Sequence, residues 1–356
     1  MAERADRYDR AYEAPLEDIA DLNREGLLLA NLDKRLGGLG FGVDGEDPLA
    51  FVLAIEHLAM VNPSTAHCFQ VHNHVVQMMS IFGSEEQRKR WLAPTVEHAA
   101  LLAGVGSEPK DAPPTAGRIV PGGIRVNGVK NYATNASMGE WILIGNVAEA
   151  DNPRVRLRLM INRNWPGVRV DDSIWRPMGM RACVSPTVYM EDCFVPDEDV
   201  VVQPQDPRDA DWLGKFHVAF ASNYIGAARG IYDWIVGYLR QRSMADAIRT
   251  LRLGELKASL DAARLLLYEA AGHFKIDTQQ AMLLGCEAKW MAKNTLVQVM
   301  HSGAELAGST AFFEKYPLER IYRDGQLHML HNRIDVVAST VGAAELGAEY
   351  DVNRER

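Results

Sequence analysis

The chain has 356 residues and a formal charge of −9. A chain of this length buries about three quarters of the surface that it exposes when unfolded, so two or three packed regions are expected. Lysine and arginine are scattered along it, which excludes the basic stripe that nucleic-acid binding needs, and no apolar run is long enough to cross a bilayer. The charged start of the chain contains no signal-peptide segment, so we expect a cytoplasmic protein whose ligands are small molecules or other proteins.

Neither cysteines nor histidines show the spacing of a metal site. The four cysteines contain no CxxC pair and are expected to be reduced thiols. His328 and His331 share a helix face, but no third ligand stands at ligand spacing, so no metal is predicted.

The first third of the chain reads as consecutive helices. Asp47 and Pro48 are typical N-cap and first-turn residues, Ser64 is a candidate cap for the next helix, and Ser84 with Gln87 forms a capping-box pattern. These signals predict helices over residues 48–61, 64–82 and 84–92. Residues 1–100 are therefore expected to form an all-α N-terminal domain.

The pattern changes after residue 101, where apolar and polar residues begin to alternate. Strands are predicted over residues 141–148, 154–162 and 187–196, and Asn127 with Gly128 predicts a tight turn. Residues 101–208 are expected to form a middle β domain. The segment 203–211, rich in Pro and Asp, is the predicted linker.

Helical periodicity returns from about residue 209 and continues to the end of the chain. Asp277 and Gln280 form a second capping-box pattern, at the start of a long amphipathic segment. The order of helices, strands and helices predicts an α+β fold, with residues 209–356 as a C-terminal helical bundle.

Four strings in the same order resemble motifs of the acyl-CoA dehydrogenase superfamily, over essentially the full length of the chain. They are GVGSEP at 104–109, NGVKNYATNA at 127–136, PMGMRACVSPTVYMEDCFVPDEDV at 177–200 and PLERIYRD at 317–324. The resemblance implies an N-terminal helical domain, a middle β-barrel-like sheet domain and a C-terminal four-helix bundle. It also implies a bound flavin, either FAD or FMN.

The resemblance assigns flavin contacts to three residues. Tyr132 would pack against the flavin ring, Thr134 would bond near the reactive N5 atom, and Ser107 would contact the flavin from the first motif. Two residues apart on a strand, Tyr132 and Thr134 would face the same side. From periodicity alone the two are a packed cross-strand pair; the motif favours the flavin contact.

Two further positions would complete a flavin site between subunits. Arg242, in a YxxxR pattern with Tyr238, matches the arginine that reaches the flavin phosphate of a neighbouring subunit, which implies a homodimer or homotetramer. A solvated helix arginine is the alternative. Gly308 matches a family glycine, and Glu305 replaces the family's glutamine, which makes FMN a candidate beside FAD.

The catalytic base of a dehydrogenase is missing from this sequence. Removal of an α-proton requires a carboxylate, but the aligned position holds Asn332, an amide. The other family location falls near Phe216, where the sequence contains no acid. Asp335 remains a weak candidate for a relocated base, because three residues on a helix lead to nearly the same face.

Histidines stand in place of the carboxylate. RDGQLHMLHNRID at 323–335 resembles the ending of the superfamily's group D flavin monooxygenases, and His72 resembles a histidine that this branch uses in its N-terminal helices. His331 would protonate or hydrogen-bond the flavin peroxide, with His72 and Asn332 as supporting polar groups. The alternative for each histidine, and for His328, is a structural role on an amphipathic helix.

The sequence therefore predicts a monooxygenase that accepts reduced flavin from a separate reductase. It would add O₂ at flavin C4a and transfer one oxygen atom from the C4a-(hydro)peroxyflavin to a small organic substrate. Two alternatives stay open: an acyl-CoA dehydrogenase or oxidase with a relocated base, and a non-catalytic partner subunit of an acyl-CoA dehydrogenase complex.

Overall fold

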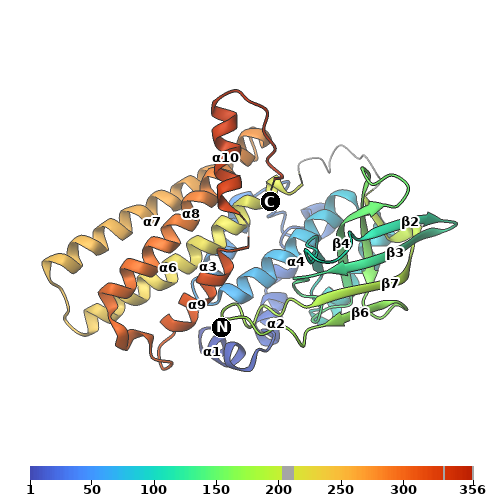
Figure 1. The fold of residues 1–356 in the computed structure, drawn as a ribbon. Coiled ribbons are helices and arrows are strands. Elements are labelled where there is room, and N and C mark those ends of the chain that lie inside the picture. The colour runs from blue at the N-terminus through green and yellow to red at the C-terminus, as the bar shows by residue number, and fades with distance from the viewer. Residues whose placement is uncertain (203–211, 332, 355–356) are drawn as a thin grey trace.

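The computed structural model describes residues 1–202, 212–331 and 333–354 of the chain. Its elements follow the predicted order of helices, sheet and helices, so the predicted fold class is confirmed. The helical bundle lies on one side of the molecule and the sheet on the other, with α4 between them (Figure 1).

The described helices are α1 (Ala2–Ala11), α2 (Leu16–Arg24), α3 (Pro48–Ala59), α4 (Pro63–Phe82), α5 (Glu85–His98), α6 (His217–Gln241), α7 (Ala247–His273), α8 (Thr278–Ala307), α9 (Leu318–His328) and α10 (Ile334–Glu345). The described strands are β1 (Ala103–Val105), β2 (Ala116–Val120), β3 (Gly123–Lys130), β4 (Trp141–Glu149), β5 (Arg156–Asn162), β6 (Val168–Asp171), β7 (Thr187–Pro196) and β8 (Val200–Val202). Within the part of the chain that is described, no helix is both long and apolar enough for a membrane span.

Side-chain caps fix where the N-terminal helices begin. The Asp47 carboxylate accepts the Ala50 amide at 3.0 Å at the start of α3, and the capping box of Ser84 with Gln87 opens α5, both as predicted. The prediction that Ser64 caps α4 is wrong. The Asn62 side chain accepts the backbone amides of the residues two and three positions on, so α4 begins at a proline that needs no amide partner.

The strands form one mixed sheet in the order β6-β7-β3-β2-β4-β5-β8, with β1 paired to β4 in parallel. The predicted turn at Asn127 and Gly128 is wrong, because β3 runs through both residues. The Asn127 side chain accepts the Asp192 amide at 2.8 Å, and the register of β3 against β7 shifts there. The chain turns instead at Pro121–Gly122, where Gly122 has φ +81°.

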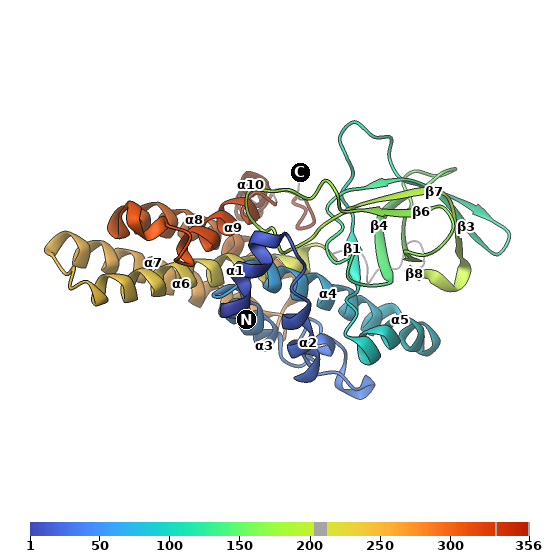
Figure 2. The same ribbon diagram turned by 90° about the horizontal axis from the view of Figure 1, so that it is seen from below.

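The sheet and the bundle meet along α4 and α5 (Figure 2), which cover one face of the sheet. The predicted linker at 203–211 and the predicted boundary at residue 208 lie outside the described residues. At the other predicted boundary, α5 ends at His98 and β1 begins at Ala103.

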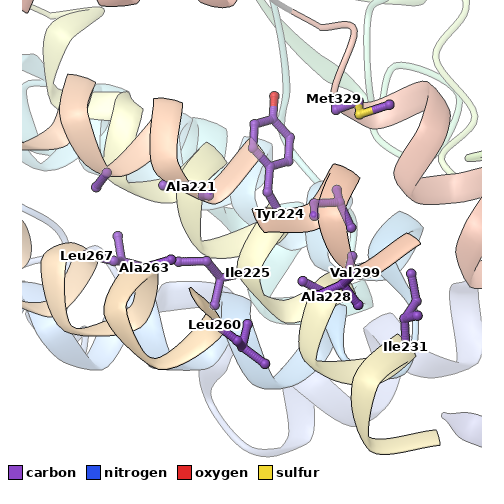
Figure 3. Packing of buried hydrophobic residues seen from close by; sticks show 14 of the residues in the cluster. Ala221, Tyr224, Ile225, Ala228, Ile231, Leu260, Ala263, Leu267, Val299 and Met329 are labelled. Carbon is purple, nitrogen blue, oxygen red and sulfur yellow. The ribbon is translucent and has the colours of Figure 1, made fainter. Parts of the chain in front are cut away.

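The C-terminal domain is built on the three long helices α6, α7 and α8, with α9 packed on α6 and α10 on α8. Aliphatic side chains of α6 interlock with those of α7 and α8, as Figure 3 shows for Ile225, Leu260 and Val299. The α3 helix of the N-terminal domain packs against α6 and α7, so the two helical domains share one core.

Close approach of α3 and α6 depends on two glycines. A Cβ atom on Gly226 would lie 2.4 Å from the Glu56 carbonyl oxygen, and one on Gly230 would lie 2.1 Å from the Met60 carbonyl oxygen. Backbone cannot yield at those distances, so both positions require glycine.

A buried carboxylate locks the same junction. Glu56 of α3 is fully buried and accepts hydrogen bonds from Arg229, from Arg264 Nε at 2.9 Å and from the Tyr268 hydroxyl at 2.6 Å. These donors come from α6 and α7, so one charge ties three helices together.

We predict that Gly230→Ala destabilises the protein by roughly 1–3 kcal/mol, because the added methyl group overpacks the junction of α3 with α6. Gly237→Ala is the matched control on the same helix, since its Cβ atom would meet nothing within 4 Å. This control should instead stabilise by roughly 0.5–1 kcal/mol. Urea unfolding of both variants measures the difference, and equal stability of the two would contradict the packing at Gly230.

Candidate functional site: a histidine-lined cavity

A cavity of about 880 Å³ lies between the helices and the sheet. Its walls come from α4, the start of α6, the end of α9, strands β1, β4 and β5, and the loops that follow β1, β3 and β6. Because all three regions of the chain contribute, the cavity exists only when they are packed together.

One face of α4 forms the helical wall. His67, Val71, His74 and Val75 line the cavity, and their spacing of four, three and one places them on a single stripe of an α-helix. The His74 ring stacks on Phe216 of the bundle side at a centroid distance of 3.7 Å.

Three histidines meet at the end of the cavity nearest the bundle. The ring of His67 contacts His328 edge-on at 4.8 Å and His331 at 5.9 Å between centroids. His331 in turn stacks on Phe220 of α6 at 4.4 Å. The structure therefore brings both histidines predicted from the C-terminal motif together with one that the sequence did not single out.

Three histidines of the lining, His67, His74 and His328, are held neutral at physiological pH. Burial, and then the neighbouring His331, lowers the pKa of His67 to about 3, and burial lowers the pKa of His74 to about 3. Burial, followed by the other two histidines, holds the pKa of His328 well below its usual value. His67 Nδ1, His74 Nε2 and His328 Nε2 are buried atoms without a hydrogen-bond partner, so each is available to a ligand or to water in the cavity.

A buried lysine lies behind this cluster. Lys289 of α8 is fully buried, its Nζ lies 3.2 Å from His217 Nδ1, and it lies 4.8 Å from the centroid of the Phe220 ring. His217 Nε2 donates to the Val352 carbonyl at 2.8 Å, so Nδ1 is the acceptor and Lys289 the donor. After burial itself, this ammonium is the main cause that lowers the pKa of His217 to about 3.

Tyr132 and Thr134 both line the cavity, but they do not lie on a strand as predicted. β3 ends at Lys130, and Tyr132 has φ +60° in the loop that follows. Ser185 Oγ donates to the Cys183 carbonyl at 2.6 Å, so the Thr134 hydroxyl donates to Ser185 Oγ at 2.8 Å. Thr134 Oγ1 therefore keeps lone pairs that can accept a hydrogen bond.

Ser107 lines the cavity beside Glu108, which is the acid among the described lining residues. Glu108 accepts the Thr115 amide at 2.9 Å and Lys130 Nζ at 2.8 Å. Burial raises the pKa of Glu108, but the ion pair with Lys130 and the hydrogen bonds from Thr115 together outweigh it, so the net pKa is lowered. This carboxylate is therefore a fixed anion in an ion pair, not a free base.

His72 is not among the described cavity-lining residues, and its catalytic role stays a prediction. Its Nε2 donates to the Leu28 carbonyl at 2.8 Å and its Nδ1 accepts the Leu102 amide at 2.8 Å, so both ring nitrogens serve the backbone. Asp335 is also displaced from the site, because α9 ends at His328 and Asp335 is an exposed residue paired with Arg333. Asn332 lies outside the described residues.

Arg242 and Gly308 do not line the cavity of the single chain. Arg242 follows α6, where its guanidinium lies 3.8 Å from the centroid of Tyr238 and donates to the Tyr316 hydroxyl at 3.0 Å. Gly308 ends α8 with φ +74°. Their predicted role toward a neighbouring subunit stays a prediction.

The sequence analysis missed His67, His74, His217 and Lys289. The first two carry a usable signal, since two histidines seven residues apart lie on one face of a helix. Lys289 and His217 lie 72 residues apart in the sequence, and no local pattern links them.

Comparison with known proteins identifies the family. Residues 1–99 match the model of the acyl-CoA dehydrogenase N-terminal domain, and residues 218–336 match a model of the C-terminal domain. The chain belongs to the acyl-CoA dehydrogenase superfamily.

Among sequence relatives, the mitochondrial short-chain specific acyl-CoA dehydrogenase of Mus musculus is 24% identical over 97% of this chain and 86% of its own. Among solved structures, FMN-bound TdsC from Paenibacillus sp. A11-2 has a TM-score of 0.88 at 22% identity, over 99% of this chain and 96% of that one. The HsaA monooxygenase from M. tuberculosis has a TM-score of 0.85 at 19% identity, over 99% and 95% of the two chains. At these identities the structural likeness shows the fold.

The buried histidines predict an acid-labile protein. Free histidine titrates near pH 6.5, whereas the pKa values of His67, His74 and His217 are each lowered to about 3. Below about pH 6.5 the unfolded chain binds protons that the folded chain does not, so the free energy of unfolding falls as the pH falls, by about 1.4 kcal/mol per pH unit for each such histidine. Urea unfolding at about pH 7.5 and about pH 5.5 measures this loss.

His74→Phe is the matched variant, because phenylalanine can keep the stacking on Phe216 but cannot titrate. It should reduce the pH dependence by about 1.4 kcal/mol per pH unit. Equal stability of the unmodified protein at both pH values would show that these rings are not buried neutral groups.

Proposed function

We propose that this protein is a flavin-dependent oxidoreductase that acts as a monooxygenase, using reduced flavin and O₂ on a small organic substrate. One observation carries the proposal. At the bundle end the cavity presents neutral imidazoles of His67 and His328 together with His331, whereas the acid of the described lining, Glu108, is held in an ion pair. Neutral imidazoles of lowered pKa are weak bases, so a site of this kind suits hydrogen bonding rather than abstraction of a carbon-bound proton.

The loop after β3 suits a flavin. Tyr132 offers an aromatic ring to the cavity although it is 60% exposed, which leaves that ring available for stacking. Thr134 Oγ1 has spare acceptor capacity, and the N5 position of a reduced flavin carries a hydrogen to donate. When bound, the reduced flavin supplies two electrons and activates O₂, so that one oxygen atom enters the substrate and the other leaves as water.

We favour FMN over FAD as the cofactor. The solved structures of similar fold include FMN-bound TdsC, and that likeness supports the smaller cofactor. Ser107 would contact the flavin from the loop after β1. Arg242 of a second copy would bind the flavin phosphate, so the proposal includes a homodimer or homotetramer. Because the reaction uses reduced flavin, the proposal also includes a separate flavin reductase.

His331 is the proposed proton donor and His67 and His328 its polar surroundings. His331 is oriented by stacking on Phe220, and an imidazole is the side chain best suited to hold and release a proton near neutral pH. An imidazole carries no negative charge, so it does not repel the negative charge that develops on the oxygen. A carboxylate at the same place would repel it.

An acyl-CoA dehydrogenase is the second candidate, because the sequence relatives carry that name. It would need a base that the described cavity lining does not offer outside the Glu108–Lys130 pair.

The proposal predicts that labelled oxygen from ¹⁸O₂ enters a bound organic substrate when the protein is supplied with reduced FMN. Indole, which is bound in a solved TdsC complex, is the probe. Mass spectrometry of the product reads the outcome. Incorporation of label supports the monooxygenase, whereas bleaching of the oxidised flavin by butyryl-CoA without label transfer would replace it with the dehydrogenase.

His331→Ala should reduce oxygen transfer by roughly 10²–10⁴-fold, the usual contribution of a positioned proton donor. Flavin affinity should stay unchanged and reduced flavin should be reoxidised with release of hydrogen peroxide. His98→Ala, a 75% exposed histidine at the end of α5, is the control and should retain full transfer. Full transfer in His331→Ala would remove His331 from the mechanism.

A further inference from the structure

His74 lines the cavity two helical turns along α4 from His67. It is only 8% exposed, and its Nε2 is a buried atom without a hydrogen-bond partner. Nearly all buried polar groups of folded proteins are paired, so this ring has an unmet hydrogen bond at the wall of the cavity.

Two aromatic rings hold the His74 imidazole in place. Phe216 stacks on it at a centroid distance of 3.7 Å and an interplanar angle of 13°, and Phe51 of α3 meets it at 5.8 Å and 66°. Trp212 packs edge-on against Phe216 at 5.0 Å, and both of these residues line the cavity. The plane of the imidazole is therefore fixed before a ligand binds, which lowers the entropy cost of a hydrogen bond to it.

The stretch of α4 between the two histidines presents apolar side chains to the cavity. Val71 and Val75 line it from the same face of the helix. Both valines face Gly104 of β1, where an added Cβ atom would lie 3.1 Å from Val75 and 3.8 Å from Val71. Seven residues of α-helix rise about 10 Å, so His67 and His74 are polar points roughly that far apart along the helix. A ligand that reaches both must have an apolar body.

His74 offers this ligand a neutral hydrogen-bonding group. Burial, and then His67, lowers the pKa of His74 to about 3, so the ring is uncharged near neutral pH. A neutral imidazole has one N–H donor and one acceptor nitrogen, and a hydroxyl group can pair with either of them. A charged group would find no opposite charge on this ring, and an apolar group would leave its hydrogen bond unmade.

We propose that His74 forms a binding subsite for an uncharged hydroxyl group of the substrate. The apolar body of the same molecule would lie along Val71 and Val75, and its reacting end would face the histidines at the bundle end of the cavity. That placement rests on the proposed monooxygenase function. Recognition of the hydroxyl group by His74 does not depend on the reaction.

A matched pair of indoles tests the subsite on the FMN-loaded protein. The two probes are 4-(indol-3-yl)butan-1-ol and 3-pentylindole, which have the same length and differ in a terminal hydroxyl or methyl group. We expect calorimetry to show that the alcohol binds about tenfold tighter, because the methyl group would leave the buried imidazole without a partner. Equal affinities, or tighter binding of 3-pentylindole, would overturn the subsite.

His74→Phe can keep the stacking on Phe216 but cannot bond a hydroxyl group. In this variant 3-pentylindole should bind tighter than the alcohol, a reversal that a loss of packing alone would not produce. His57→Phe is the control, because His57 is exposed on α3 and is not among the described cavity-lining residues. It should keep the preference for the alcohol. A preference for the alcohol that persists in His74→Phe, or that is also reversed in His57→Phe, would contradict the role of His74.

The ribityl hydroxyls of the flavin are a second source of the same chemistry, so the binding of FMN and of lumiflavin, which lacks the ribityl chain, must be compared as well. Loss of FMN affinity in His74→Phe without loss of lumiflavin affinity would assign His74 to the cofactor and overturn the proposal. Failure of ¹⁸O transfer with the preference for the alcohol intact would instead remove the monooxygenase and leave the hydroxyl subsite standing.

Discussion

The near-complete burial of α4 is the constraint on which the site depends. This helix lies between the bundle and the sheet, yet it carries polar side chains on more than one face. On the side away from the cavity, His72 bonds two backbone groups and Asn73 Nδ2 donates to the Leu27 carbonyl at 3.3 Å, whereas the buried Gln70 amide has no partner. On the cavity side, His67 and His74 keep a nitrogen without a partner. Buried polar groups need partners, so these two nitrogens are points at which the helix can bind a ligand or water in the cavity.

The same constraint sets the chemistry. Histidines inside a packed interface lose their charge to desolvation, and Lys289 behind Phe220 adds a positive field that opposes the protonation of His328 further. The superfamily's carboxylate would have to be ionised at this place. The sequence holds an amide at the aligned position, and the neutral rings of His67 and His328 offer hydrogen bonds without negative charge.

The sequence predicted correctly those parts of the fold that depend on interactions between residues close together in the chain. The caps at Asp47 and Ser84 and the strand over 187–196 follow from hydrogen bonds and periodicity within a few residues. The turn at Asn127 was predicted wrongly, since that side chain bonds across the sheet to Asp192, which no local pattern contains. The candidate site divides in the same way. Tyr132, Thr134 and His331 belong to strings that could be recognised, whereas the roles of His72 and Lys289 depend on partners far along the chain.

His72 joins two regions through one ring. Its Nε2 must carry the hydrogen donated to Leu28, so the lone pair on Nδ1 is what holds the Leu102 amide at the entry to β1. A doubly protonated ring has no lone pair to offer, and the contact to Leu102 would then break. The hydrogen bond that attaches the start of β1 to the helical domain thus exists only in one tautomer of His72. Proton uptake by this residue, which lies outside the cavity, would release the wall of the cavity that β1 forms.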